Sequence, residues 1–523
     1  MALAQGPGGI FVASTAPWQA IFDPTSQGQG QARSVWAPFA RAPFRLILLL
    51  VLVPVAILNW GEAVTGLVLA TTAIRMAVGR AVQGWSGVAR RRVRACATVG
   101  DRANAVAVEL AATLWAAGAS VAILLIGAVT VPPAAARLSL QHTEVPINVE
   151  NFLAFEAAVL VLWPLLATLV AASDGRQGGE REASWAGRYG LAHASVLLAL
   201  AVWGLPPILW PLLAFLATAG ALIAVTAVRS RELRPTALQA NELYGLSAEL
   251  RRLPAEALRS SWGEPGSSPV LSVAALPYVW THGFQKSLVP LALALVAQSL
   301  AECISELASR VEPLTHDISL YADMHRARFR FKRMTDAAVL LACGAAMVIG
   351  AYGPGLVRGW LGIGAVPQLL AGAMALFVLA SAPGGVAARW LNRSGNSSAV
   401  AIVLRVDVTL AVLLGALFAA TGNANWTEQA LILVALHGVL AGVLLPGLAA
   451  RELGIAAIPM ALGRAWRYTM VALPAALAAF AVSGMRPPRT LREWLIQMAV
   501  VGILYAVPGF TAWNLLDSRR GER

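Results

Sequence analysis

The sequence has little charge, almost no lysine and few cysteines. Only 13% of its 523 residues are charged, whereas 58% are hydrophobic. A soluble domain carries about 25% charged residues. The composition therefore excludes an ordinary soluble protein. Lysine occurs only at Lys286 and Lys332, so nearly all the positive charge comes from arginine.

Cysteine pairs and catalytic signatures are also missing. Cys96, Cys303 and Cys343 lie far apart, with the spacing of neither a disulfide framework nor a metal site. The chain contains no HExxH motif, no phosphate-binding Gly-rich loop ending in Lys-Ser/Thr and no nucleophile elbow. We therefore expect no catalytic residues, no metal and no cofactor. A membrane-embedded transferase, which would use scattered polar residues, remains an alternative.

What the chain has instead is a series of long apolar stretches. A helix needs about 20 apolar residues to cross the hydrocarbon core, and in lipid only helices and closed barrels satisfy every backbone group. The stretches are too long and too continuously apolar for barrel strands. The sequence therefore predicts an all-α polytopic membrane protein with about 14 transmembrane helices, in two six-helix bundles plus two C-terminal helices. We place the spans near 44–60, 63–79, 106–131, 150–172, 186–204, 206–228, 270–285, 287–309, 335–352, 364–383, 398–421, 427–447, 467–484 and 493–515.

Basic residues concentrate in alternate connecting segments. Segments 80–105, 229–269 and 310–334 each hold six of them. By the positive-inside rule, these segments and both termini are cytoplasmic. The formal net charge of +13 then reflects topology, and we expect no nucleic-acid partner. One predicted external loop, 485–492, departs from the rule because it holds Arg486, Arg489 and Arg492.

The longest cytoplasmic segment divides the chain near its middle. Its leucines between residues 236 and 258 recur at helical spacing among charged residues, which predicts an amphipathic helix in the membrane interface. The expected organisation is a flexible cytoplasmic tail at 1–43, a first six-helix bundle at 44–228, a cytoplasmic linker at 229–269, a second six-helix bundle at 270–447, and two further helices with a tail at 448–523.

Ionisable side chains inside the predicted spans are the candidate functional residues, because charge at bilayer depth is costly. For each of them the alternative is an ion pair or hydrogen bond between helices. That structural role is the favoured interpretation for four residues, which are Glu109, Glu156, His193 and His437.

Two arginines are stronger candidates for binding a substrate. Arg75 and Arg405 have no well-placed acidic neighbour on their own helix. A guanidinium group binds phosphate oxygens in a bidentate way, so an arginine in a hydrated central cavity suits a phosphate group. Lys286, between the seventh and eighth spans, could join such a site. Arg75, Lys286 and Arg405 are therefore the substrate-binding candidates.

Three acidic residues are candidates for coupling transport to an ion gradient. Glu302, Glu306 and Arg310 share one helix face because they are four residues apart. Glu306 could pair with Arg310, which leaves Glu302 for another partner. Asp407 is two residues from Arg405 and therefore points in a different direction. Glu302, Glu306 and Asp407 make up this set.

Three stretches resemble a known group of transporters. GAYGPGLVRGWLG at 350–362 resembles the end of that group's ninth span, a Gly- and Pro-marked turn before Trp-Leu-Gly. ASRVEPLTHDISLYADMHRARFRFKR at 308–333 resembles the exit of its eighth span, and LNWGEAVTGLVLATTAI at 58–74 its short first external turn. The group is the MOP superfamily (multidrug/oligosaccharidyl-lipid/polysaccharide exporters), in particular its polysaccharide-type flippases. The resemblance implies a cationic central cavity for a pyrophosphate-linked sugar.

The function expected from these features is that of a flippase or exporter in a bacterial inner membrane. It would move a lipid-linked oligosaccharide or polysaccharide precursor by alternating access, without a chemical reaction. Its partners would be membrane lipids, the lipid-linked sugar and the polysaccharide-synthesis machinery. Two alternatives stay open: a non-transporting scaffold of an exopolysaccharide complex, and a membrane-embedded polymerase or ligase.

The arginine distribution makes a topological prediction. Reporter proteins fused after residues 95, 245 and 325 should all report a cytoplasmic location, because each position lies in an arginine-rich segment. The measurement is the ratio of reporter activities that require opposite sides of the membrane. A periplasmic signal at any one of the three positions would contradict the topology.

Overall fold

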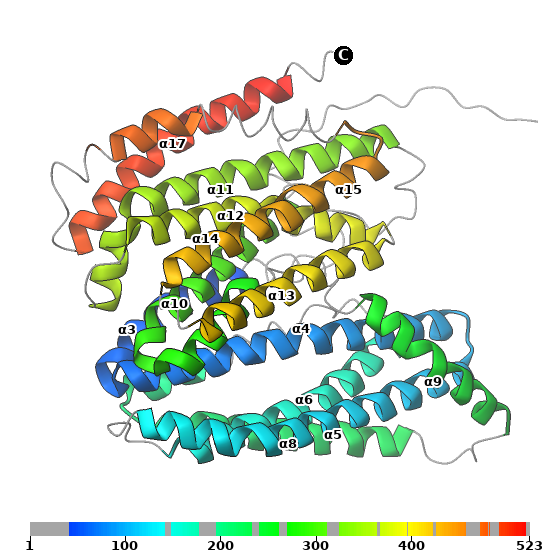
Figure 1. The fold of residues 1–523 in the computed structure, drawn as a ribbon. Coiled ribbons are helices and arrows are strands. Elements are labelled where there is room, and N and C mark those ends of the chain that lie inside the picture. The colour runs from blue at the N-terminus through cyan, green and yellow to red at the C-terminus, as the bar shows by residue number, and fades with distance from the viewer. Residues whose placement is uncertain are drawn as a thin grey trace, which may run out of the picture.

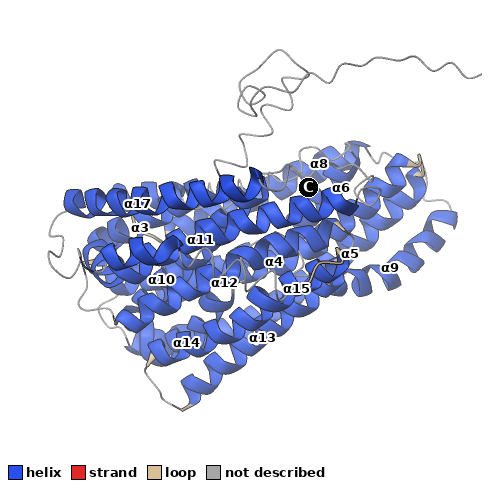
Figure 2. Ribbon diagram, turned by 90° about the horizontal axis from the view of Figure 1, so that it is seen from above, coloured by secondary structure: helices blue, strands red, loops and turns tan. Residues whose placement is uncertain are grey.

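A computed structural model describes most of the chain, and it is helical throughout the described part. Its residues are 41–141, 148–176, 195–232, 240–260, 269–310, 324–362, 367–394, 396–421, 425–456, 471–479, 481 and 491–518. Over these residues the regular structure is helix, with no strand (Figure 2). The all-α polytopic membrane fold is thereby confirmed, and the protein is a multi-pass membrane protein.

The helices follow the order of the predicted spans. The elements are α3 (Arg41–Trp60), α4 (Glu62–Thr98), α5 (Arg102–Gln141), α6 (Val149–Arg176), α8 (Leu209–Glu232), α9 (Ala240–Ser260), α10 (Val270–Arg310), α11 (Met324–Leu361), α12 (Gln368–Arg393), α13 (Ser397–Ala420), α14 (Trp426–His437), the π-helix η2 (Gly438–Leu444), α15 (Leu445–Glu452) and α17 (Leu491–Ser518). In the described part, nine segments are long and apolar enough to cross a membrane. Parts of the predicted spans 186–204 and 467–484 lie outside the described residues, as do His193, Arg486 and Arg489.

Several helices are longer than the apolar runs suggest. The second span was expected to end near residue 79, but α4 continues to Thr98 through the arginine-rich stretch. Arginine and alanine favour helix, and this stretch contains no proline to stop it. At 1.5 Å per residue, the 37 residues of α4 extend about 56 Å, well beyond the hydrocarbon core of about 30 Å. Likewise α11 begins at Met324, inside the expected loop.

Two sharp kinks, one between α3 and α4 and one inside α10, have the same backbone conformation. Gly61 separates α3 from α4 with φ 82° and ψ 168°, and Gly283 interrupts α10 with φ 79° and ψ 175°. That backbone region is accessible essentially only to glycine. Thr65 and Ser287 each donate a hydroxyl hydrogen bond to the kink carbonyl four residues earlier, at 2.8 and 2.5 Å. The kink at Gly283 also explains why two spans were predicted where one element, α10, is found.

The helices form two groups that meet at α4 and α10. In Figure 1, α4, α5, α6 and α8 lie on one side and α11, α12, α13, α15 and α17 on the other, with α10 between them. The contacts agree, since α6 packs against α4, α5 and α8, whereas α12 packs against α10, α11 and η2. The α3 helix, which opens the described part of the chain, contacts α10 and α11 as well as α4. The exact domain boundaries proposed from the sequence stay a prediction.

The contact between α4 and α10 is unusually close. The carbonyl oxygen of Phe284 would lie only 2.3 Å from a Cβ atom at Gly66. Only glycine at this position lets the two backbones approach so closely, as in other tightly packed membrane helices. Ser272, Ser287 and Gln298 of α10 are fully buried. The α10 helix is thus the central element around which both groups pack.

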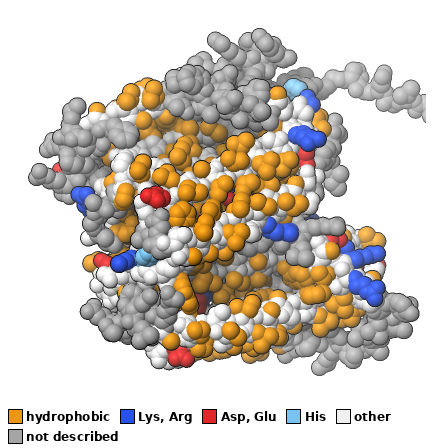
Figure 3. All heavy atoms as spheres, in the orientation of Figure 1, with side chains coloured by type: hydrophobic (Ala, Val, Ile, Leu, Met, Phe, Trp, Pro, Cys, Tyr) orange, Lys and Arg blue, Asp and Glu red, His pale blue; other side chains and the backbone are white. Residues whose placement is uncertain are grey.

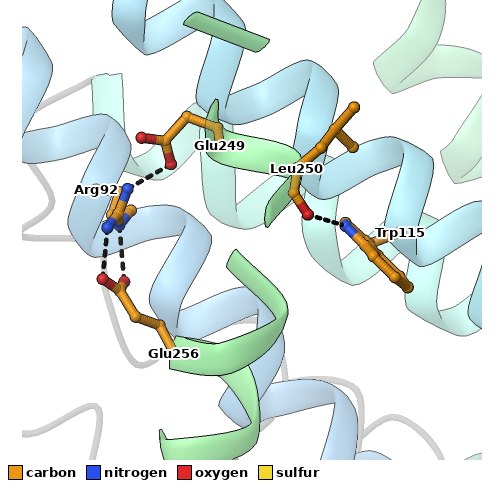
Figure 4. A network of polar contacts seen from close by, with 5 residues as sticks. All are labelled: Arg92, Trp115, Glu249, Leu250 and Glu256. Carbon is orange, nitrogen blue, oxygen red and sulfur yellow. Dashed lines mark hydrogen bonds and ion pairs between the residues drawn. The ribbon is translucent and has the colours of Figure 1, made fainter. Parts of the chain in front are cut away.

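The expected amphipathic helix is present as α9, and it is fixed to the first group. Leu246, Leu250 and Leu253 pack around Trp85 and its buried neighbours on α4 and α5. On its polar face, Glu249 and Glu256 both pair with Arg92 of α4, and the Trp115 indole donates to the Leu250 carbonyl at 3.0 Å (Figure 4). The same helix also contacts α13, so it touches both groups.

The α4–α10 contact predicts a steric effect. Gly66→Ala should destabilise the protein by about 1–3 kcal/mol, because the new methyl group overlaps the Phe284 carbonyl. Gly79→Ala is the matched control, since Gly79 lies on the same helix and a Cβ atom there would meet nothing within 4 Å. The measurement is the apparent unfolding temperature in detergent. Equal unfolding temperatures for the two variants would contradict the packing described here.

Candidate functional site

Two ion pairs cross between the helices of the first group. Arg75 on α4 pairs with Glu156 on α6, and their side chains are only 9% and 5% exposed. The Arg75 guanidinium also lies over the ring of Trp210 on α8, 5.2 Å from its centre. Glu109 on α5 pairs with Arg176 at the end of α6. The charge of Arg75 is therefore balanced inside the bundle. An ion pair between helices is the role that the sequence analysis favoured for Glu156.

A third ion pair joins the two groups of helices. Arg80 on α4 contacts Glu302 on α10, with Nη2 and Oε1 3.2 Å apart. These residues occupy equivalent positions in the two kinked units, because both the residue pair and the kink glycines are 222 residues apart (80 to 302, and 61 to 283). The pair therefore lies where α4 and α10 face each other. Beside it, Arg389 of α12 donates to the Ser305 carbonyl of α10 at 3.2 Å.

Sequence reasoning missed Arg80 and Arg389 as site residues. Both lie just beyond the expected ends of their spans at 79 and 383, so they were counted as cytoplasmic loop arginines. In the structure α4 and α12 continue past them. The offset of 222 residues between the two kink glycines was the one signal that could have matched Arg80 with Glu302.

A fully buried polar network lies in the second group. Asp407 on α13 accepts a hydrogen bond at 2.6 Å from His437 Nδ1 on α14. The other imidazole nitrogen, Nε2, is 2.7 Å from the hydroxyl of Ser381 on α12. Exposure of the three residues is 2%, 1% and 7%. The Phe377 ring stacks on the imidazole with centres 4.7 Å apart. Ser381 was not predicted, because nothing in the sequence brings these three helices together.

Arg405 is placed differently from the other arginines. It is half-buried on α13, at the edge between the buried face that holds Ala401 and Val408 and the exposed face that holds Val406. Its Nε and Nη2 atoms are buried without a hydrogen-bond partner among the described residues. Asp407 does not neutralise it, since that carboxylate pairs with His437. Arg405 therefore holds a charge that the described part of the bundle does not balance.

The remaining candidates do not gather with Arg405. Lys286 is exposed three residues after the Gly283 kink, where the neighbouring Gln285 binds Glu62 at the start of α4. Arg405 lies toward the opposite end, in the half of α13 nearer the start of that helix. Glu306 is half-buried one turn beyond Glu302 on α10. Among the described residues, no three potential metal ligands come together.

The surface between the two groups is hollowed. Figure 3 shows a depression between the layer that contains α13 and the layer that contains α4, α5 and α8. Its visible walls are mainly hydrophobic, with basic and acidic side chains near the margin. A depression of this kind, apolar with a few charged groups, suits an amphiphile.

The comparisons with known proteins find a likeness among solved structures. No protein-family model matches the sequence, and no curated protein matches it. The fold is similar to the crystal structure of the eukaryotic MATE transporter AtDTX14, with 14% sequence identity and a TM-score of 0.43, over 83% of this chain and 99% of that one. The likeness assigns neither an activity nor a substrate.

The buried Arg75–Glu156 pair predicts a large stability effect. Glu156→Gln should lower the free energy of unfolding by about 3–5 kcal/mol, because it leaves a guanidinium uncompensated inside the bundle. Glu256→Gln, at a side chain that is 41% exposed, should cost about 1 kcal/mol or less. Unfolding in mixed micelles measures both.

The double variant Arg75→Leu, Glu156→Leu tests whether the stability loss comes from the uncompensated charge. Removing both charges should restore most of the lost stability, since two apolar side chains of similar size replace the buried pair. If Glu156→Gln proves as stable as Glu256→Gln, the pair does not hold α4 against α6.

Proposed function

We propose that the protein is a bacterial inner-membrane flippase or exporter that moves a lipid-linked oligosaccharide or polysaccharide precursor by alternating access. The observation that carries this proposal is Arg405. Its guanidinium has two buried nitrogen atoms without a hydrogen-bond partner in the described structure, on a helix that borders the hollow of Figure 3.

An uncompensated arginine within a membrane span needs a stabilising partner. A charged side chain at the bilayer centre costs about 2.5–3.5 kcal/mol on insertion scales. A pyrophosphate group would balance the charge and accept paired hydrogen bonds from the planar guanidinium. Because Arg75 is already paired with Glu156, Arg405 is the better of the two arginines for this role. Lys286, near the other end, could meet the headgroup after it has crossed.

The two groups of helices supply the moving parts. They meet along α4 and α10, which are in close contact at Gly66 and joined again by the Arg80–Glu302 ion pair. Rocking of one group against the other would open one side of this contact as the opposite side closes. The apolar walls of the hollow would accommodate the lipid portion. No covalent bond is made or broken in this process, so the protein would not act as an enzyme.

Arg405→Ala tests the proposal. The protein is reconstituted in liposomes with a polyprenyl-pyrophosphate-linked oligosaccharide, and its exposure on the opposite leaflet is followed over time. Hydrogen bonds to a charged group are worth about 1.5–3 kcal/mol, so we expect the initial rate to fall about tenfold or more. Arg405→Lys, which keeps the charge without the planar fork, should give an intermediate rate.

Arg358→Ala is the matched control, because Arg358 is exposed at the end of α11. It should flip at the wild-type rate. A wild-type rate in Arg405→Ala would remove Arg405 from the substrate site. No flipping by the wild-type protein itself would favour a scaffold in the polysaccharide-synthesis machinery.

A further inference from the structure

The Asp407–His437–Ser381 network has properties that a purely structural contact does not need. It joins α12, α13 and α14 through hydrogen bonds of 2.6 and 2.7 Å. An ionisable pair at this depth is costly and is by default a functional candidate. A structural link between the same helices could use neutral side chains at a lower cost.

The chemistry of the three groups allows two protonation states. An ionised carboxylate only accepts hydrogen bonds, so His437 Nδ1 carries a proton toward Asp407. The second nitrogen, Nε2, can accept from the Ser381 hydroxyl when the ring is neutral, or donate to it when the ring is an imidazolium. A hydroxyl does either. Both hydrogen bonds therefore survive the gain or loss of one proton at Nε2.

The two protonation states differ in net charge. With a neutral ring, the network holds one uncompensated negative charge, whereas with an imidazolium it holds a neutral ion pair. Burial penalises a net charge far more than a close pair. A sodium ion would need several oxygen ligands, as other hard cations do. Here one carboxylate oxygen already binds the imidazole, and the third member offers only a hydroxyl.

We propose that the Asp407–His437–Ser381 network is a proton-binding site, with the added proton held at His437 Nε2. This proposal rests on the proposed function, which supplies the transported substrate, and it identifies the coupling ion as a proton.

The helices around the site carry both acidic and basic side chains. The helices packed around it are α10, α12, α13, α14 and η2. Asp407 and His437 make their hydrogen bonds within the described structure to each other and to Ser381. The other ionisable side chains described on these helices include Arg405 on α13, Arg389 on α12, Glu428 on α14, and His282, Glu302 and Glu306 on α10.

The site is also connected to the tightest packing in the second group. His437 directly precedes the π-helix η2, a feature frequent at functional sites. The carbonyl oxygen of Ala441 in η2 would lie 2.3 Å from a Cβ atom at Gly384 on α12, one turn from Ser381. Reversal of the Ser381–His437 hydrogen bond therefore acts where α12 and η2 have no room to shift independently.

The test measures proton binding without any substrate. Protein labelled with [15N]histidine is placed in liposomes, and the ring signals are recorded by solid-state NMR between about pH 4 and about pH 9. Among the six histidines, His437→Asn identifies the signal. The His437 signal should change from neutral ring to imidazolium as the pH falls. Asp407→Asn should weaken proton binding at least tenfold, because the counter-charge is lost.

A second variant covers the case in which Asp407→Asn fails to fold. Ser381→Ala keeps the ion pair, so the change with pH should persist, whereas the Nε2 signal should move because its partner is gone. A His437 signal that stays the same across the pH range would overturn the proposal, as would displacement of the titration by added sodium. Covalent labelling of Ser381 by a fluorophosphonate would indicate a nucleophilic serine instead.

Flipping under an imposed pH gradient completes the experiment. The wild-type rate should depend on the gradient, and the rate of a folded Asp407→Asn variant should not. If His437 titrates but the lipid-linked oligosaccharide is not flipped, the proposed substrate fails and the proton site stands. If flipping occurs without titration of His437, the proton site fails and the flippase stands.

Discussion

The requirement that charge be balanced inside a nonpolar medium underlies the arrangement of this bundle. Water is absent from the hydrocarbon core, so each ionised side chain there needs a partner from another helix. Arg75 pairs with Glu156, Arg176 pairs with Glu109, and Asp407 accepts a hydrogen bond from His437. Each pair joins two helices that apolar packing alone would leave free to slide, because lipid tails are as apolar as leucine. Arg405 stands apart because its charge has no such partner in the described structure.

The two groups of helices are related by how each begins. A glycine in a conformation closed to other residues redirects the chain at Gly61 and again at Gly283, and a hydroxyl four residues later bonds the kink carbonyl. The helices that leave these kinks, α4 and the long part of α10, then pack against each other. Arg80 and Glu302 occupy matching positions and carry opposite charges, so this contact is electrostatically complementary as well as close.

The sequence was sufficient for features that depend on local composition. The length of each apolar run predicted the helices, and leucine spacing predicted α9. Helix ends were less predictable, because arginine-rich stretches continue α4 and α11 beyond the membrane, where hydropathy gives no signal. Partners were the least predictable. Asp407 was selected as functional and His437 as structural, yet they form one unit with Ser381, since pairing depends on which helices become neighbours.

The length of α4 amplifies any change in its tilt. The helix contacts α10 closely at Gly66, near one end, and beyond this contact it continues as one helical arm for 32 residues (66 to 98). At 1.5 Å per residue this arm measures about 48 Å. A tilt of about 10° at the Gly66 contact would therefore displace the far end of the helix by about 8 Å. Glu249 and Glu256 of α9 pair with Arg92 on this arm. They therefore tie α9 to the part of α4 that a small tilt would displace the most.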